Sequence, residues 1–227
     1  RTADQHSVYK NAAKEIASQH GHAITFMAKY DEREGNSCHI HMSARGEDGS
    51  IVFDEGDGPT QTFEHFVAGI QATLYDFTLL DAPNINSYKR FAPGSFAPTA
   101  IAWGRDNRTC ALRVVGHGPS LRVENRLPGG DVNPYLGLAG MLAGGLYGIE
   151  NELALEPAYE GNAYESDKRH VPRTLQEARD AFGASKVARS TFGDAVVDHY
   201  LNNADVELAA FNTAVTDWER FRSFERM

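Results

Sequence analysis

Two histidines separated by a single residue, His39 and His41, are the first side chains that could do chemistry. In an extended strand, residues two apart project to the same face, so both imidazoles could reach one ligand. A divalent metal ion is one such ligand, but a zinc site usually needs a third protein ligand, and no H-E-x-x-H or C-x-x-C motif supplies it. The alternative interpretation is a solvent-facing or structural pair.

A second candidate group lies on residues 121–126, whose sequence is Leu-Arg-Val-Glu-Asn-Arg. Strand alternation would place Arg122, Glu124 and Arg126 on one face of this segment. Two guanidinium groups beside one carboxylate can form an exposed ladder of ion pairs. They can instead bind a phosphate or a carboxylate, because each guanidinium offers two parallel N–H donors.

Further arginines make the middle of the chain locally cationic. Arg90, Arg108 and Arg113 precede the segment just described, in a chain whose net charge is −9. A polyanion such as a nucleoside triphosphate would be attracted to this part of the sequence. From the residues alone, we predict that the chain binds a phosphorylated anion, with a divalent metal ion on His39 and Glu124.

The elements that must position these residues are short strands flanked by helices. Apolar spacing and end signals predict helices over residues 2–20, 62–79, 133–149, 174–183 and from 203 to the end. Strands are predicted over residues 23–29, 38–43, 99–103, 109–115 and 121–126. Gly140, Gly144 and Gly148 recur every four residues in one helix, and because each glycine costs about 1 kcal/mol there, they indicate a closely packed second backbone. The predicted fold class is α+β, an antiparallel sheet with flanking helices in one domain.

Composition excludes several classes of protein. The chain has 227 residues, 41% of them hydrophobic, with 22 Lys and Arg against 31 Asp and Glu. It can bury one core, and its negative charge argues against a nucleic acid or an anionic membrane as partner. No segment has the about 18 consecutive apolar residues that span a membrane. The isolated Cys38 and Cys110 are typical of reduced thiols in a cytoplasmic protein.

Five blocks of the sequence together resemble the glutamine synthetase family. They are GNSCHIHMS at residues 35–43, NSYKRFAPG at 86–94, NRTCALR at 107–113, RVENR at 122–126 and NPYL at 133–136. The blocks occur in the family order over essentially the whole chain. The resemblance implies the C-terminal portion of the catalytic domain over residues 1–227. An N-terminal β-grasp-like domain and the first catalytic strands would lie outside it, so the chain alone is expected to be inactive.

The resemblance also implies a reaction, in which ATP phosphorylates the γ-carboxylate of glutamate and an amine then displaces the phosphate. His39 and Glu124 would ligate one Mg²⁺ or Mn²⁺ ion. ATP would contact two residues of the histidine strand and three arginines, namely His41, Ser43, Arg108, Arg113 and Arg122. Glutamate would contact Gly35, Arg90 and Arg126, and the implied catalytic residues are Arg108 and Arg126. The implied assembly is a cytoplasmic homo-oligomer of stacked rings, resembling a dodecamer.

One departure from the family pattern concerns the amine. Members that use ammonia carry a Glu in a Gly-Tyr-Glu-Ala-Pro stretch, whereas residues 94–98 here are Gly-Ser-Phe-Ala-Pro, which places Phe96 at that position. A phenyl ring cannot accept a proton from ammonium, but it can pack against the apolar stem of a larger amine. The pattern therefore resembles the γ-glutamylpolyamine synthetase branch.

Two alternatives remain at the level of the sequence, an ordinary glutamine synthetase and a non-catalytic relative with the same fold. The second is disfavoured because a protein without catalysis has no physical reason to keep several mutually repelling arginines around a pocket. Tyr164 falls near the loop where some bacterial members of the family are adenylylated. Its neighbours match that loop poorly, so regulation at this residue is not predicted.

Overall fold

The structure, a computed structural model, describes residues 1–226. Its helices are α1 (Thr2–Gln19), α2 (Gln61–Asp81), α3 (Pro134–Glu150), α4 (Leu175–Ala184), α5 (Lys186–Phe192), α6 (Asp194–Thr213) and α7 (Asp217–Ser223). Its 3₁₀ turns are η1 (Ile85–Arg90), η2 (Gly118–Ser120) and η3 (Ala163–Glu165). Its strands are β1 (Ile40–Met42), β2 (Trp103–Arg105), β3 (Leu112–Val115) and β4 (Arg122–Asn125). No helix of residues 1–226 is long and apolar enough to cross a membrane.

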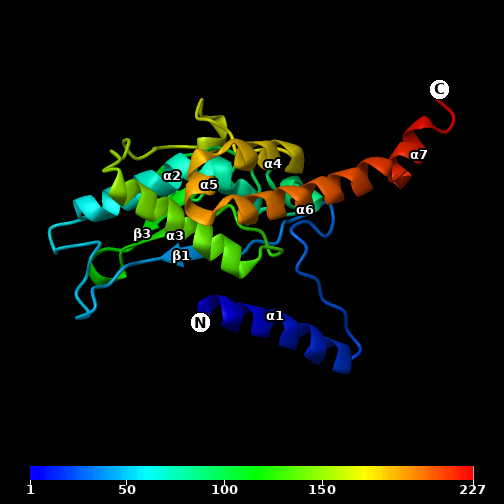
Figure 1. The fold of residues 1–227 in the computed structure, drawn as a ribbon. Helices are drawn as coiled ribbons and strands as arrows, with labels where there is room; N and C mark the ends of the chain where they lie inside the picture. The colour runs from blue at the N-terminus through cyan, green and yellow to red at the C-terminus, as the bar shows by residue number, and fades with distance from the viewer. Residues whose placement is uncertain (227) are drawn as a thin grey trace.

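The four strands form one sheet in the order β1-β4-β3-β2, with helices packed around it (Figure 1). The α+β class predicted from the sequence is confirmed. The β1–β4 and β3–β4 pairs are antiparallel, as predicted, but β2 pairs with β3 in parallel, with Trp103 opposite Leu112. Because β4 lies between β1 and β3, its residues have neighbours on both sides. This central strand carries Glu124.

Two predicted strands are corrected by the structure. Residues 23–29 form no strand, because the backbone N–H and carbonyl of Lys29 bond the side chain of Asn86 rather than a second strand, both at 2.8 Å. The strand predicted over residues 99–103 instead begins at Trp103. The residues just before it pair with a different part of the chain, since Val171 donates its N–H to the carbonyl of Thr99 at 3.1 Å.

The C-terminal region also differs from the prediction. Helix α6 begins about ten residues before the predicted start, and the short α5 was not predicted. The last helix is interrupted before α7, where the side chain of Thr216 accepts a hydrogen bond from the backbone of Glu219 and caps a new helix. Trp218 and Phe221 are exposed, and this end of the chain projects from the body of the molecule (Figure 1).

The core has two parts that both contain α2. One group of buried side chains includes Val67 and Ile70 from α2 together with Leu112 and Val123 from the sheet. The other joins the second half of α2 to α4, α5 and α6, with Phe182 among its fully buried members. Helix α2 therefore packs against the sheet with one group of side chains and against the C-terminal helices with the other.

The glycines of α3 allow the backbones of α2 and α3 to approach closely, as their spacing predicts. A Cβ atom added to Gly148 would lie 2.0 Å from the carbonyl oxygen of His65, and one added to Gly69 of α2 would lie 2.2 Å from that of Gly144. Real Cβ atoms do not come so near a backbone oxygen. The two helices can therefore approach this closely only because these positions are glycines without side chains.

This packing predicts unequal effects for two alanine substitutions in the same helix. Gly148→Ala should lower the free energy of unfolding by about 3 kcal/mol, because the new methyl group meets rigid backbone. Gly140→Ala should stay within about 1 kcal/mol of wild type, since its Cβ would contact side chains and no backbone, the nearest being the end of Leu80 at 3.2 Å, and alanine favours the helix. Denaturant unfolding of both variants measures the difference, and equal losses would contradict the close-packing interpretation.

Candidate active site

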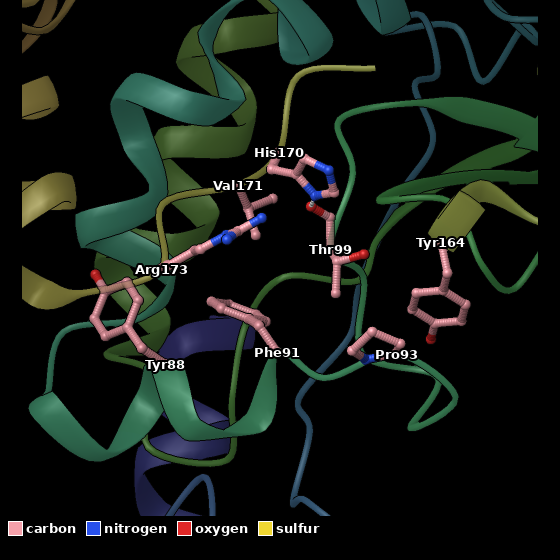
Figure 2. A pocket seen from close by; sticks show the side chains of 8 residues that line it. All are labelled: Tyr88, Phe91, Pro93, Thr99, Tyr164, His170, Val171 and Arg173. Atoms are coloured by element: carbon pink, nitrogen blue, oxygen red, sulfur yellow. Dashed lines mark hydrogen bonds between the residues drawn. The ribbon is translucent and has the colours of Figure 1, made fainter. Parts of the chain in front are cut away.

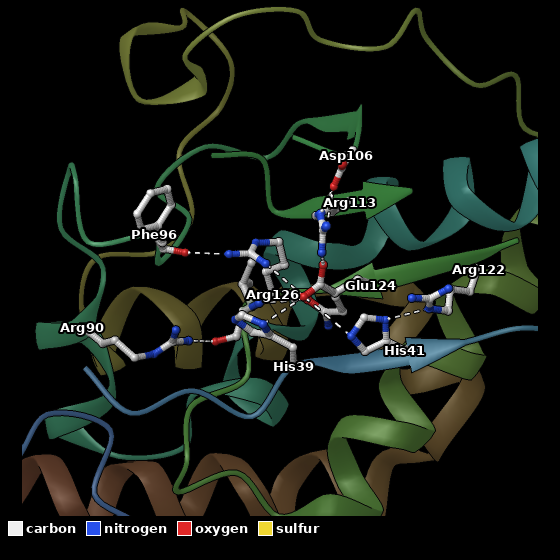
Figure 3. Close-up of polar contacts among 11 residues, drawn as sticks. His39, His41, Arg90, Phe96, Asp106, Arg113, Arg122, Glu124 and Arg126 are labelled. Carbon is white, nitrogen blue, oxygen red and sulfur yellow. Dashed lines mark hydrogen bonds and ion pairs between the residues drawn. The ribbon is translucent and has the colours of Figure 1, made fainter. Parts of the chain in front are cut away.

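Glu124 is the centre of the predicted site, and two arginines bind its carboxylate (Figure 3). Arg113 lies opposite it on β3 and donates to Oε2 at 2.9 Å, and Arg126 follows it in the chain and donates to Oε1 at 2.9 Å. The carboxylate is almost fully buried. Two guanidinium groups flank one carboxylate, as predicted, but the second comes from β3. Arg122 instead bonds Nδ1 of His41 at 3.3 Å.

The two histidines converge on the same carboxylate. Nδ1 of His39 lies 2.9 Å from Oε1 of Glu124, and Nε2 of His41 lies 3.7 Å from it. The prediction that both imidazoles share one face is therefore confirmed. An imidazole nitrogen and a carboxylate oxygen this close are a suitable pair of donors for one divalent ion. Residues 1–226 contain no group of three or more His, Cys, Asp or Glu side chains that could complete such a site.

Electrostatics keep Glu124 ionised. Burial by itself would raise the pKa of this carboxyl group, but the hydrogen bonds from His39 and Arg113 and the charge of Arg126 outweigh it and lower the pKa to about 2. Burial lowers the pKa of His41, although the negative charge of Glu124 opposes that shift. The site therefore holds a permanent anion beside an imidazole that loses its proton readily.

The lowered pKa of Glu124 predicts how stability depends on pH. The pKa falls from 4.5 to about 2 on folding, so ionised Glu124 contributes on the order of 3 kcal/mol above pH 4.5, lost as pH falls toward 2. Glu124→Gln should remove this contribution, and the stability difference from wild type should shrink below pH 4.5. Denaturant titrations at several pH values measure it. Asp205→Asn, which breaks an exposed ion pair with Arg179, should cost less than about 1 kcal/mol. If the stability difference between wild type and Glu124→Gln did not change with pH, the lowered pKa assigned to Glu124 would be wrong.

Arg90 and Gly35, both predicted to contact glutamate, lie side by side. Arg90 is buried, and its Nη2 donates to the carbonyl of Leu127. A Cβ atom on Gly35 would lie 2.4 Å from Cγ of Arg90, so the glycine leaves the space that the arginine stem fills. Burial lowers the pKa of Arg90 to about 10, with the charges of Asp131 and Asp81 acting in the opposite direction.

The remaining predicted residues are more exposed. Arg108 and Ser43 make no side-chain hydrogen bond within residues 1–226, although the charge of Arg108 acts on Arg126. The four arginines that the resemblance places around ATP and glutamate, Arg90, Arg108, Arg113 and Arg126, are absent from the linings of five cavities in the described part of the chain. Arg113 and Arg126 share Glu124 as their partner, whereas Arg90 binds the carbonyl of Leu127.

Sequence reasoning missed the support beneath β4. Asp81, buried at the end of α2, accepts a hydrogen bond from Nδ2 of Asn125 at 2.9 Å, and Asn125 in turn accepts one from the backbone of Leu127 at 3.1 Å. Burial raises the pKa of Asp81 to about 7. This chain of contacts places the Leu127 carbonyl that Arg90 binds. The sequence feature that could have indicated this support is Asn125, a polar residue on the otherwise apolar face of β4.

The geometry of Phe96 could not be read from the sequence. Its φ angle is +57°, a conformation that bulky residues rarely adopt, and its side chain is 60% exposed. This backbone turn directs the carbonyl of Phe96 to Nη2 of Arg126 at 3.1 Å (Figure 3). The aromatic ring is therefore available to a ligand, while the backbone contacts the buried arginine. Unusual backbone angles of this kind cluster at functional sites.

Comparison with known proteins agrees with this arrangement. The sequence profile of the glutamine synthetase catalytic domain matches residues 1–223. A solved structure of GmaS in complex with ADP superposes with a TM-score of 0.90 and 32% identity, covering 99% of this chain and 54% of that one. The chain therefore belongs to the glutamine synthetase family, and the fold implied by the five sequence blocks is confirmed.

Two curated relatives within this family are similar to the chain. The chain is 63% identical to γ-glutamylethanolamide synthetase of Streptomyces coelicolor, over 100% of this chain and 49% of that protein. It is 36% identical to γ-glutamylputrescine synthetase of Escherichia coli, over 92% of this chain and 45% of that protein. The chain thus spans about half the length of the curated relatives it matches.

Proposed function

We propose that this chain is the C-terminal part of the catalytic domain of an ATP-dependent ligase that joins the γ-carboxylate of glutamate to a small organic amine. The observation that carries the proposal is the buried Glu124, bound by Arg113 and Arg126, beside a loop that presents Phe96 where ammonia-using members carry a carboxylate. The names of the two relatives support an organic amine, since one makes an ethanolamide and the other acts on putrescine.

His39 and Glu124 are the residues that would hold a divalent ion, Mg²⁺ or Mn²⁺. Such an ion supplies positive charge that neutralises phosphate oxygens. The further ligands would come from parts of the protein outside this chain. The close approach of Nδ1 of His39 to Oε1 of Glu124, 2.9 Å, supports a shared ion at this point.

The arginines would bring two anions together. Arg108, Arg113 and Arg122, with His41 and Ser43, would contact ATP, with Arg108 and Arg113 on its phosphates. Arg90 and Gly35 would bind glutamate, with the guanidinium taking a carboxylate. Arg126 is buried and would stabilise the charge that spreads over the transferring phosphoryl group, because a buried, oriented guanidinium stabilises charge more than water does.

The assembly is proposed from the same family membership. We infer a cytoplasmic homo-oligomer of stacked rings formed by the full-length protein. Exposed apolar side chains such as Val8 on α1 and Trp218 and Phe221 on α7 support subunit contacts in these regions, since monomers rarely expose so many.

The experiment that tests the proposed function is an amine panel. The full-length enzyme is given ATP, glutamate and Mg²⁺ with ethanolamine, putrescine, spermidine or ammonia, and mass spectrometry measures the γ-glutamyl amide. We expect faster amide formation with an organic amine than with ammonia. Glutamine formed from ammonia as fast as any other amide would identify an ordinary glutamine synthetase. No amide with any amine would favour a non-catalytic relative.

A further inference from the structure

The loop that carries Phe96, residues 92–98, is called the flap here. Two hydrogen bonds tie its backbone to distant parts of the chain. Arg126 donates to the carbonyl of Phe96 and the hydroxyl of Tyr164 donates to the carbonyl of Ala97, both at 3.1 Å. In the proposed function Arg126 binds phosphate oxygens, which would weaken the first of these bonds. Tyr164 is then the remaining side chain that ties a flap carbonyl across the site.

Tyr164 is itself held by the turn that carries Arg108. The η3 turn containing Tyr164 begins where the backbone N–H of Ala163 donates to the hydroxyl of Thr109 at 2.9 Å. Asn107 donates to the carbonyl of Gly161 at 2.9 Å. Asn107 and Thr109 are the immediate neighbours of Arg108 in the chain. The position of the Tyr164 hydroxyl is therefore linked to the turn that presents this arginine.

A cavity of about 350 Å³ lies against the two ends of the flap (Figure 2). Pro93 and Thr99 line it from the flap side, and Tyr164 and His170 line it from the opposite segment. The hydroxyl of Thr99 is buried there without a hydrogen-bond partner in the described structure. The cavity therefore leaves open space beside Pro93 in the flap and beside Thr99, which follows it, although Ala97 is buried. A loop with open space beside it can move, so its few hydrogen bonds determine where it rests.

We propose that Tyr164 is a positioning residue that holds the flap closed and so decides whether an amine or water reaches the γ-glutamyl phosphate. This proposal rests on the proposed function. With the flap closed, the amine nitrogen attacks the γ-carbonyl carbon, the bond from this carbon to the phosphate oxygen breaks, and phosphate leaves with the electron pair and takes up the proton that the nitrogen loses. With the flap loose, water attacks the same carbon, the same bond breaks, and glutamate and phosphate are formed, with the protons of the water passing to phosphate. The second route consumes ATP without forming amide.

The test is Tyr164→Phe in the full-length enzyme, which removes the donor and keeps the ring. Tyr159→Phe is the matched control, because it removes a hydroxyl from the same segment that does not contact the flap. The hydrogen bonds of Tyr159 are made by its backbone and not by its hydroxyl. Amide and ADP are measured together with ethanolamine as the amine. One lost hydrogen bond should lower the amide formed per ADP by about threefold to tenfold and raise the KM for the amine.

The KM for ATP and the melting temperature should stay near wild type in both variants, and Tyr159→Phe should keep the wild-type ratio of amide to ADP. A wild-type ratio in Tyr164→Phe would overturn the proposal, and so would an equal loss in both variants. Absence of amide in the wild-type enzyme with every amine would instead refute the proposed function. The two failures are therefore distinguishable.

Discussion

Replacement of Arg108 by alanine is expected to lower kcat about a thousandfold, with a much smaller change in the KM for glutamate. The physical reason is that negative charge on the transferring phosphoryl group develops in the transition state, so a guanidinium that meets it there acts on kcat. Arg108 is exposed and makes no hydrogen bond within residues 1–226, so its removal should leave stability unchanged. Steady-state kinetics with varied glutamate separate the two parameters.

Arg105→Ala is the control for that measurement. Arg105 is also exposed and lies three residues before Arg108 at the end of β2, so both variants remove one positive charge from the same region. The control should retain most of the wild-type kcat. If Arg108→Ala kept the wild-type kcat, or if both variants lost it equally, Arg108 would have no specific role in catalysis.

Replacement of Phe96 by glutamate is expected to shift the enzyme from organic amines toward ammonia. An exposed ring can bury the methylene groups of a bound amine, each worth about 0.8 kcal/mol, so two methylenes account for roughly a 15-fold preference. The glutamate removes this surface and adds a carboxylate that can hold ammonium. The ratio of kcat/KM for ethanolamine to kcat/KM for ammonia should therefore fall by at least that factor.

Phe96→Gln separates the two causes, because it removes the ring without adding charge. It should reduce turnover with ethanolamine as Phe96→Glu does, but it should give little ammonia-dependent activity. If neither variant changed the ratio, the side chain of Phe96 would not determine amine specificity. If the wild-type enzyme already preferred ammonia, the specificity assigned to the flap would be wrong.

Local periodicity explains why much of the site could be predicted. Alternation along one strand is a property of the backbone, so it placed His39 and His41 on one face and Glu124 with Arg126 on one face, as the structure has them. The regular glycines of α3 similarly indicated a close helix contact, because a missing side chain is costly unless a backbone fills its place. These features depend on neighbours in the sequence.

Only the tertiary structure decided which distant parts of the chain contact the residues of the site. Sequence patterns could not show that β3 lies beside β4, which gives Glu124 the partner Arg113 in place of Arg122. They could not show that residues 23–29 lack a partner strand. The hydrogen bond from Tyr164 to Ala97 joins residues 67 positions apart. The amino-acid sequence by itself determined which side chains were available and which faces they share. Register, burial and backbone direction follow from packing the whole chain, because each depends on contacts that no short segment contains.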